Sequence, residues 1–172
     1  MDSVKRAWQL RESASVERLH TCRHRPGYSN GFHVNAMLLL LDQLYPGTPP
    51  YNLVRAILLH DVHELWLGDM PAPAKRLDPE LGTAYAAAAA LVEDELDLGV
   101  PVTKNESRWL HALDALEFFM FTLDELNAGN DHIRHCADRI AEALGKMDLP
   151  DEVKKFVVQL DEKGWQRTDE RL

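Results

Sequence analysis

The chain has 172 residues, a formal net charge of −9 and two cysteines, Cys22 and Cys136. This length suffices for one domain with a hydrophobic core, and two cysteines are too few for a disulfide framework. The acidic balance argues against duplex nucleic acid or an anionic membrane as the main partner, because both attract basic surfaces. No apolar run approaches the length of a membrane span, so we expect a cytoplasmic protein with free thiols.

The spacing of apolar and breaker residues is helical along almost the whole chain, and no strand-like alternation competes with it. We therefore predict an all-α fold, a single helical bundle formed by residues 1–172. The predicted helices cover residues 4–10, 30–45, 52–66, 79–98, 104–126, 131–144 and 152–163.

The helix predicted over residues 30–45 carries one imidazole in its apolar stripe. His33 shares a face with Met37 and Leu41. A single histidine in such a stripe is more often a hydrogen-bonded core residue than a metal ligand, and both interpretations stay open on this helix alone.

Residues 60–75, HDVHELWLGDMPAPAK, concentrate polar side chains after an apolar stripe. In the helix predicted over 52–66, His60 and Glu64 continue the stripe, and Asp61 is close enough to share a divalent ion with His60. Such an ion would activate water, and Glu64 could exchange the proton. The plainer alternative is a surface His-Asp pair beside a core histidine.

The same segment ends in a proline-containing loop. Pro71 and Pro73 fix φ and restrict the residues before them, so we expect Asp69 and Lys75 to be held on a rigid loop. His63 points away from the predicted ligand face, which favours a surface or packing role.

The helix predicted over residues 104–126 places Asp114 on a face that we expect to be buried. An ionised carboxylate there is expensive unless it is paired or bound to a metal. Together with His33 and the pair His60 and Asp61, three helices would each contribute a ligand and leave coordination positions open, as a catalytic ion requires.

These histidines and aspartates resemble the H…HD…D pattern of the HD-domain phosphohydrolases, all-helical metal enzymes that cleave phosphate esters. Residues 60–75 resemble the HDxxExxxGDxPxPxK segment of their small single-domain branch. That branch includes bacterial 5'-deoxynucleotidases and phage deoxynucleoside triphosphohydrolases, one type of which is specific for dATP. The spacing from Arg18 to His33 is similar to that branch too, and the resemblance covers about residues 18–126.

The resemblance implies one divalent metal ion, Zn, Co or Mn, with the ligands His33, His60, Asp61 and Asp114. It implies that Glu64 acts on the attacking water or the leaving oxygen, and that Asp69 orients this chemistry or contacts the sugar. The implied candidates for binding the phosphates and the base are Arg18, Leu19, Thr21, Pro73, Lys75 and His111.

Two departures from the family bear on the substrate. The bacterial deoxynucleotidases have a tryptophan where this chain has Leu19, and the phage triphosphohydrolases have a lysine at the position of His111. From the first departure we predict a dNTP triphosphohydrolase, with dATP as substrate, that releases deoxynucleoside and triphosphate. A 5'-deoxynucleotidase acting on monophosphates is the near alternative.

Two further hypotheses stay in view, a non-catalytic HD protein that binds nucleotides and a purely structural bundle without metal. We expect a small nucleotide as partner, a closed homo-oligomer, and a location in the cytoplasm of a bacterium or a phage-infected cell.

Overall fold

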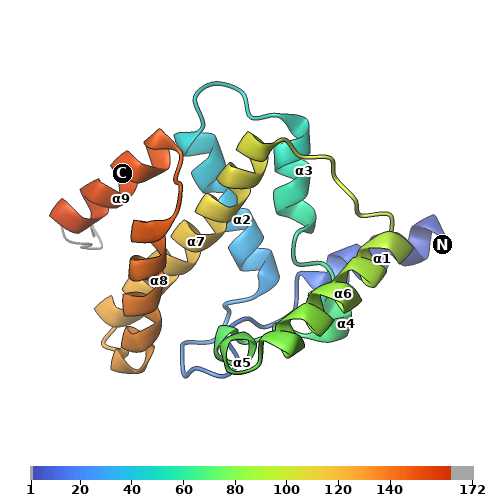
Figure 1. Cartoon of the computed structure of the whole chain (residues 1–172), viewed down its shortest axis with the longest axis horizontal. Helices are drawn as coiled ribbons and strands as arrows, with labels where there is room; N and C mark the ends of the chain where they lie inside the picture. The colour runs from blue at the N-terminus through green and yellow to red at the C-terminus, as the bar shows by residue number, and fades with distance from the viewer. Residues whose placement is uncertain (1, 164–172) are drawn as a thin grey trace.

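The computed structural model describes residues 2–163, and within them the chain is helical without a β-strand (Figure 1), which confirms the predicted all-α fold. The longer helices are α1 (Ser3–Ser13), α2 (Asn30–Leu44), α3 (Tyr51–Leu59), α6 (Pro79–Glu95), α7 (Lys104–Asn127), α8 (Arg134–Lys146) and α9 (Asp151–Lys163). The shorter ones are α4 (Glu64–Leu67), α5 (Ala72–Leu77) and the 3-10 turn η1 (Asp131–Ile133). None of these described helices combines the length and apolar character needed to cross a bilayer.

Helix α7 is the centre of the fold and contacts α2, α3, α8 and α9 (Figure 1). Its start is fixed by a capping box in which Thr103 and Glu106 exchange hydrogen bonds between side chain and backbone. The buried apolar side chains around it are Met37, Leu41, Leu53, Ile57, Trp109, Ala112, Leu113, Leu116, Leu144, Leu149 and Val153. This packing sets the relative positions of α2, α3 and α7.

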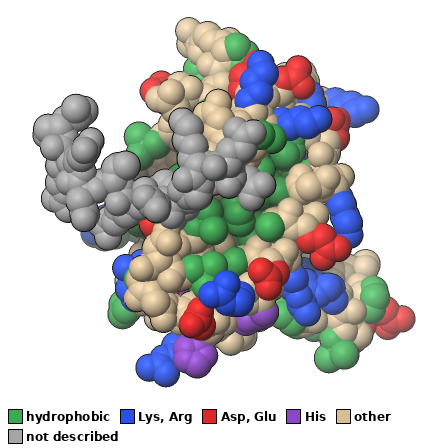
Figure 2. Space-filling view, turned by 90° about the vertical axis from the view of Figure 1, so that its left-hand side faces the viewer, with side chains coloured by type: hydrophobic (Ala, Val, Ile, Leu, Met, Phe, Trp, Pro, Cys, Tyr) green, Lys and Arg blue, Asp and Glu red, His purple; other side chains and the backbone are tan. Residues whose placement is uncertain are grey.

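Helices α8 and α9 close the other side of this core. Partly buried apolar side chains of α8, of α9 and of the segment between them pack against the core: Ile140, Met147, Phe156, Val157 and Leu160. Figure 2, which views this side of the molecule, shows hydrophobic side chains near the middle of the face and charged side chains around them.

A smaller buried cluster holds the turn that follows α3. Val62 is 5% exposed and packs with Leu96 and Leu98, which follow α6. Apolar side chains of α1 and α3 border this cluster. The turn of residues 60–63 is therefore anchored by its own apolar residue.

Two predictions for residues 52–77 were wrong. The helix predicted over 52–66 ends at Leu59, and α4 starts only at Glu64. Between them the backbone forms tight i+3→i hydrogen bonds, such as Glu64 N–H to the Asp61 carbonyl at 3.1 Å, because Val62 turns into the small cluster. The proline loop is partly helical as α5, since prolines are tolerated in the first turn of a helix.

Candidate active site

Two histidines and an aspartate meet beside the core. His33 comes from α2, and His60 and Asp61 come from the turn after α3. One ligand atom of each lies within 4.8 Å of those of the other two. Asp114 of α7 joins them, with its Oδ1 3.1 Å from His33 Nε2. The structure thus brings the four predicted metal ligands together.

The hydrogen bonds of the two imidazoles leave one nitrogen of each available. His33 Nδ1 is paired with the buried carboxylate of Glu117, and His60 Nδ1 donates to the Ile57 carbonyl at 2.8 Å. Since both partners are acceptors, the proton of each neutral ring sits on Nδ1. The two Nε2 atoms are buried and make no hydrogen bond of good geometry. Each instead faces a carboxylate oxygen, of Asp114 at 3.1 Å and of Asp61 at 3.0 Å. Such an arrangement, with the second nitrogen held by a carbonyl or carboxylate, is typical of metal-binding histidines.

The charges of the cluster also fit a cation. Burial lowers the pKa of His60, but the carboxylate of Asp61 outweighs burial and raises that pKa to about 9. The pKa of His33 is raised in the same way, against burial, by Asp114 and Glu117. Both shifts mean that the site favours positive charge. The residues present therefore fit a divalent ion of the first transition row, which imidazole and carboxylate groups bind well.

Arg18 enters the same cluster from the loop between α1 and α2. Its Nη1 pairs with Asp61 Oδ2 and donates to Asn30 Oδ1 at 3.2 Å, and its Nη2 lies 3.9 Å from Asp114 Oδ1. Burial disfavours the charged guanidinium, but Asp61 and the neighbouring carboxylates raise its pKa well above the usual value. Arg18 is thus a permanent cation beside two of the predicted metal ligands.

Glu64 lies at the start of α4 and is 8% exposed. Its Oε2 accepts a hydrogen bond from Asn30 Nδ2 at 2.9 Å. Burial, with a smaller contribution from the charge of Asp61, raises the pKa of Glu64 to about 7. A carboxyl group with this pKa can give or take a proton near neutral pH.

Asp69 faces the loop that carries Arg18. Its Oδ2 accepts a hydrogen bond from the Leu19 backbone N–H at 2.7 Å. Leu19 has a φ of 56°, a left-handed conformation that bulky side chains adopt only when their surroundings hold them there. The backbone before Asp69 is held as well, because the Tyr85 hydroxyl donates to the Gly68 carbonyl at 2.7 Å.

The other residues predicted to bind substrate lie outside the cluster of predicted metal ligands. Lys75 is on α5, with its ammonium 5.0 Å from the centre of the Tyr85 ring. Thr21, Pro73 and His111 are exposed at the surface.

A pocket of about 290 Å³ opens beside Asn30 and Asp61 and has mostly apolar walls from α1, α2 and α3. Its lining does not include Leu19, Thr21 or Pro73.

The prediction from sequence missed Glu117, Tyr28 and Asn30. Glu117 holds His33 and also accepts from the Tyr28 hydroxyl at 2.8 Å. Its signal in the sequence was its place one turn after Asp114 on the same helix. His63 turns away, with its Nδ1 3.6 Å from Glu93 of α6, in line with the predicted packing role.

Comparisons with known proteins agree on one family. A family model described as 5'-deoxynucleotidase YfbR-like matches residues 32–163. A 5'-deoxynucleotidase of Photobacterium profundum is 24% identical, and the alignment covers 94% of this chain and 93% of that protein. A 5'-deoxynucleotidase of Vibrio atlanticus is 23% identical over 84% of this chain and 80% of that protein.

Two solved structures share the fold. The PH0347 protein of Pyrococcus horikoshii superposes with a TM-score of 0.69 and 14% identity, covering 92% of this chain and 98% of that one. The HD phosphohydrolase DatZ of cyanophage S-2L, solved with dA and one catalytic Zn²⁺ ion, superposes with a TM-score of 0.68 and 19% identity over 95% of both chains.

Proposed function

Because the chain belongs to the YfbR-like 5'-deoxynucleotidase family and is a metal-dependent HD-domain phosphohydrolase, we propose that it hydrolyses the 5'-phosphate ester of 2'-deoxynucleotides. Water adds to the phosphorus, the bond between phosphorus and O5' breaks, and the deoxynucleoside leaves with a proton on O5'. The observation that carries this proposal is the convergence of the buried Nε2 atoms of His33 and His60 on the carboxylates of Asp114 and Asp61.

In this proposal His33, His60, Asp61 and Asp114 hold one divalent ion. The ion, when bound, supplies Lewis acidity toward a phosphate oxygen and lowers the pKa of the attacking water.

The side chains around these ligands take the other roles. Glu64 takes the proton of the water or delivers one to O5', which its pKa of about 7 permits in either direction. Arg18 neutralises charge at the phosphate. Asp69, fixed by the Leu19 N–H, orients the reacting groups or contacts the sugar.

We favour monophosphates as substrates over the triphosphate predicted from sequence. The curated relatives are named 5'-deoxynucleotidases and align with most of this chain. The positions of the predicted phosphate-binding cations support the same choice. Of Arg18, Lys75 and His111, only Arg18 lies in the cluster. Lys75 lies over the ring of Tyr85, and the exposed His111 stands where the phage triphosphohydrolases have a lysine.

A dATP triphosphohydrolase is the second candidate. The cyanophage enzyme that shares the fold was solved with dA, and this chain has Leu19 rather than a tryptophan after Arg18. Both candidates break the same bond with the same Glu64, and they differ in the length of the phosphate chain that the protein must bind.

A substrate panel separates them. The protein is loaded with Zn²⁺, Co²⁺ or Mn²⁺, incubated with dNMPs, dNTPs and ribonucleotides, and the products are resolved by chromatography, with Asp61→Ala as the control for contaminating phosphatases. Release of deoxynucleoside and phosphate from dNMPs supports the proposal, and release of triphosphate from dATP supports the second candidate. Metal-loaded protein that turns over no nucleotide would contradict both and leave a nucleotide-binding role.

A further inference from the structure

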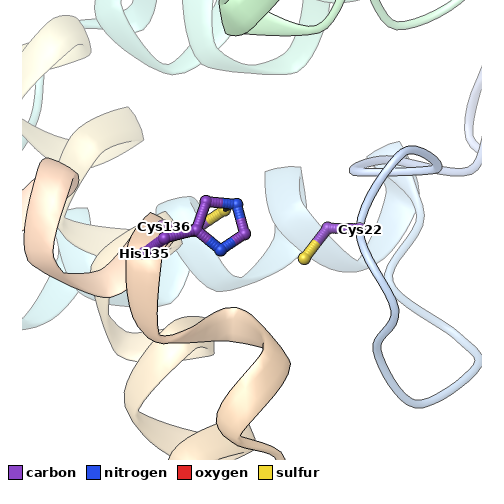
Figure 3. Close-up of side chains that lie close together, drawn as sticks. All are labelled: Cys22, His135 and Cys136. Atoms are coloured by element: carbon purple, nitrogen blue, oxygen red, sulfur yellow. Dashed lines mark hydrogen bonds between the residues drawn. The ribbon is translucent and has the colours of Figure 1, made fainter.

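A second cluster of metal-binding side chains lies outside the candidate active site. Cys22 comes from the loop between α1 and α2, and His135 and Cys136 are neighbours in the first turn of α8. Their sulfur and nitrogen atoms all lie within 4.8 Å of one another. Figure 3 shows the Cys22 sulfur on the side of its loop that faces the imidazole and the second sulfur.

The histidine of this cluster directs its coordinating nitrogen at a sulfur atom. His135 Nδ1 is 3.0 Å from the His132 carbonyl oxygen, which can only accept, so the ring proton belongs on Nδ1. The lone pair of Nε2 then faces Cys136 Sγ at 3.3 Å. This is the same arrangement, a carbonyl behind the ring and a ligand atom in front, that His60 has in the active site.

We propose that Cys22, His135 and Cys136 bind a second transition-metal ion of the zinc class. Two sulfurs and one imidazole nitrogen select Zn²⁺ over the oxygen-seeking ions Mg²⁺ and Ca²⁺. In a tetrahedral zinc site the sulfurs lie about 3.8 Å apart. The present spacing of up to 4.8 Å therefore needs only a small closure. Three protein ligands leave one position for water or an external ligand.

The thiol of Cys22 is held by the same carbonyl that holds His135, since its Sγ lies 3.7 Å from the His132 oxygen. The thiolate is the form of cysteine that binds a metal, so an ion bound here would displace the thiol protons. Both cysteines are free thiols in the structure.

The site would tie the loop to α8. The Cys22 N–H donates to the Leu19 carbonyl at 2.9 Å, and the Leu19 N–H donates to Asp69. An ion on Cys22 would therefore restrict the loop three residues from a predicted substrate contact. This consequence for substrate binding rests on the proposed function, but the metal site itself does not.

Cobalt substitution tests the site directly. The reduced full-length protein is titrated with Co²⁺, and the thiolate-to-cobalt charge-transfer absorption is recorded. The active-site ligands contain no sulfur, so this absorption reports on the cysteines alone. We expect the band in the wild type, its loss in Cys22→Ser and Cys136→Ser, and its weakening in His135→Ala.

His132→Ala is the matched control, because it removes a neighbouring exposed imidazole and keeps the carbonyl that holds His135. For Zn²⁺, loss of either cysteine should reduce affinity by more than the roughly 100-fold typical of outer-shell partners. Circular dichroism of each variant shows whether it is folded.

Three outcomes would overturn the proposal. The first is no charge-transfer band in the reduced wild type, and the second is a band that survives both serine substitutions. The third is a quantitative Cys22–Cys136 disulfide whose reduction gives no charge-transfer band. Failure of the proposed function is distinguishable from these outcomes. Asp61→Ala should keep the charge-transfer band while losing the active-site ion, and a protein that shows the band but hydrolyses no nucleotide keeps the second site and loses only the proposed activity.

Discussion

The helices and the loop around the candidate active site are built differently. His33 is positioned by the packing of α2 against α7 and by a buried carboxylate behind its ring. The loop of residues 18–27 has no regular helix and is held by polar contacts spread along it, at Arg18, Leu19, Arg23 and Arg25. The packed helices, with the anchored turn after α3, hold the predicted metal ligands in fixed positions, whereas the loop gives contacts that can be lost one at a time. Substitutions on these helices and this turn should therefore reduce metal binding and kcat, and substitutions in the loop should reduce substrate affinity and stability.

The largest effect should come from Asp61→Ala. This change removes a predicted ligand and the partner of both His60 and Arg18, so we expect loss of the bound ion and of activity. Elemental analysis measures the bound ion, and turnover of the preferred nucleotide measures the activity. Asp61→Asn is the control of equal size. Full turnover in the alanine variant would show that the cluster of His33, His60, Asp61 and Asp114 is not the catalytic site.

Glu64→Gln should keep the ion and lower kcat by about 10²- to 10⁴-fold, the usual contribution of a general acid or base. Because the pKa of Glu64 is about 7, the wild-type rate should change around that pH. If Glu64 acts as a base, it acts as the carboxylate, so the turnover rate rises as the pH increases through 7. If Glu64 acts as an acid, it acts in the protonated form, so the turnover rate falls as the pH increases through 7. Identical pH profiles for wild type and variant would exclude both roles.

Glu117→Gln should reduce metal affinity or activity by about 10- to 100-fold, because Glu117 fixes the ring of His33 without belonging to the predicted ligands. Tyr28→Phe removes the second hydrogen bond to the same carboxylate and should have a smaller effect. Zn²⁺ competition with a chromophoric chelator measures the affinity. An unchanged affinity in Glu117→Gln would mean that packing alone orients His33.

The loop side of the comparison is tested at Glu125, which is fully buried and accepts from Arg25 Nε at 2.6 Å and from Asn130 Nδ2 at 2.7 Å. Glu125→Ala should lower the free energy of unfolding by about 1 to 3 kcal/mol, because it removes the acceptor of both donors, while water can solvate the half-exposed Arg25. The bound ion and kcat should change little, while KM should rise several-fold. Urea unfolding measures the loss of stability, and steady-state kinetics measure KM and kcat. A kcat loss as large as that of Glu64→Gln would show that the loop also controls the catalytic step.

The same residue gives a pH dependence of stability. Burial raises the pKa of Glu125, but its hydrogen bonds with Arg25 and Asn130 outweigh burial and lower that pKa below the ordinary 4.5. The folded state thus binds the proton less readily than the unfolded state, so the contribution is complete above pH 4.5 and is lost as the pH falls through the folded pKa. Below pH 4.5, the difference in unfolding free energy between wild type and Glu125→Gln should therefore shrink.

The sequence was sufficient for the parts that depend on helical periodicity. The stripes of α2 and α7 predicted that His33 and Asp114 face inward. The structure brings both to one point, with His33 fully buried and the Asp114 side chain 43% exposed. Periodicity could not foresee the break after Leu59, because that turn depends on a distant cluster around Val62. Nor could it place Cys22 against α8, since that contact joins residues more than a hundred positions apart.

The left-handed backbone of Leu19 limits how this proposed base contact could be redesigned. In a library of variants at this position, asparagine and glycine would accept the backbone easily, whereas valine and isoleucine would resist it because of their branched Cβ. Leucine and isoleucine have nearly equal volumes, yet only isoleucine would disturb the hydrogen bond to Asp69. A selection for altered base preference at position 19 would therefore recover backbone-compatible residues first, whatever base they recognise.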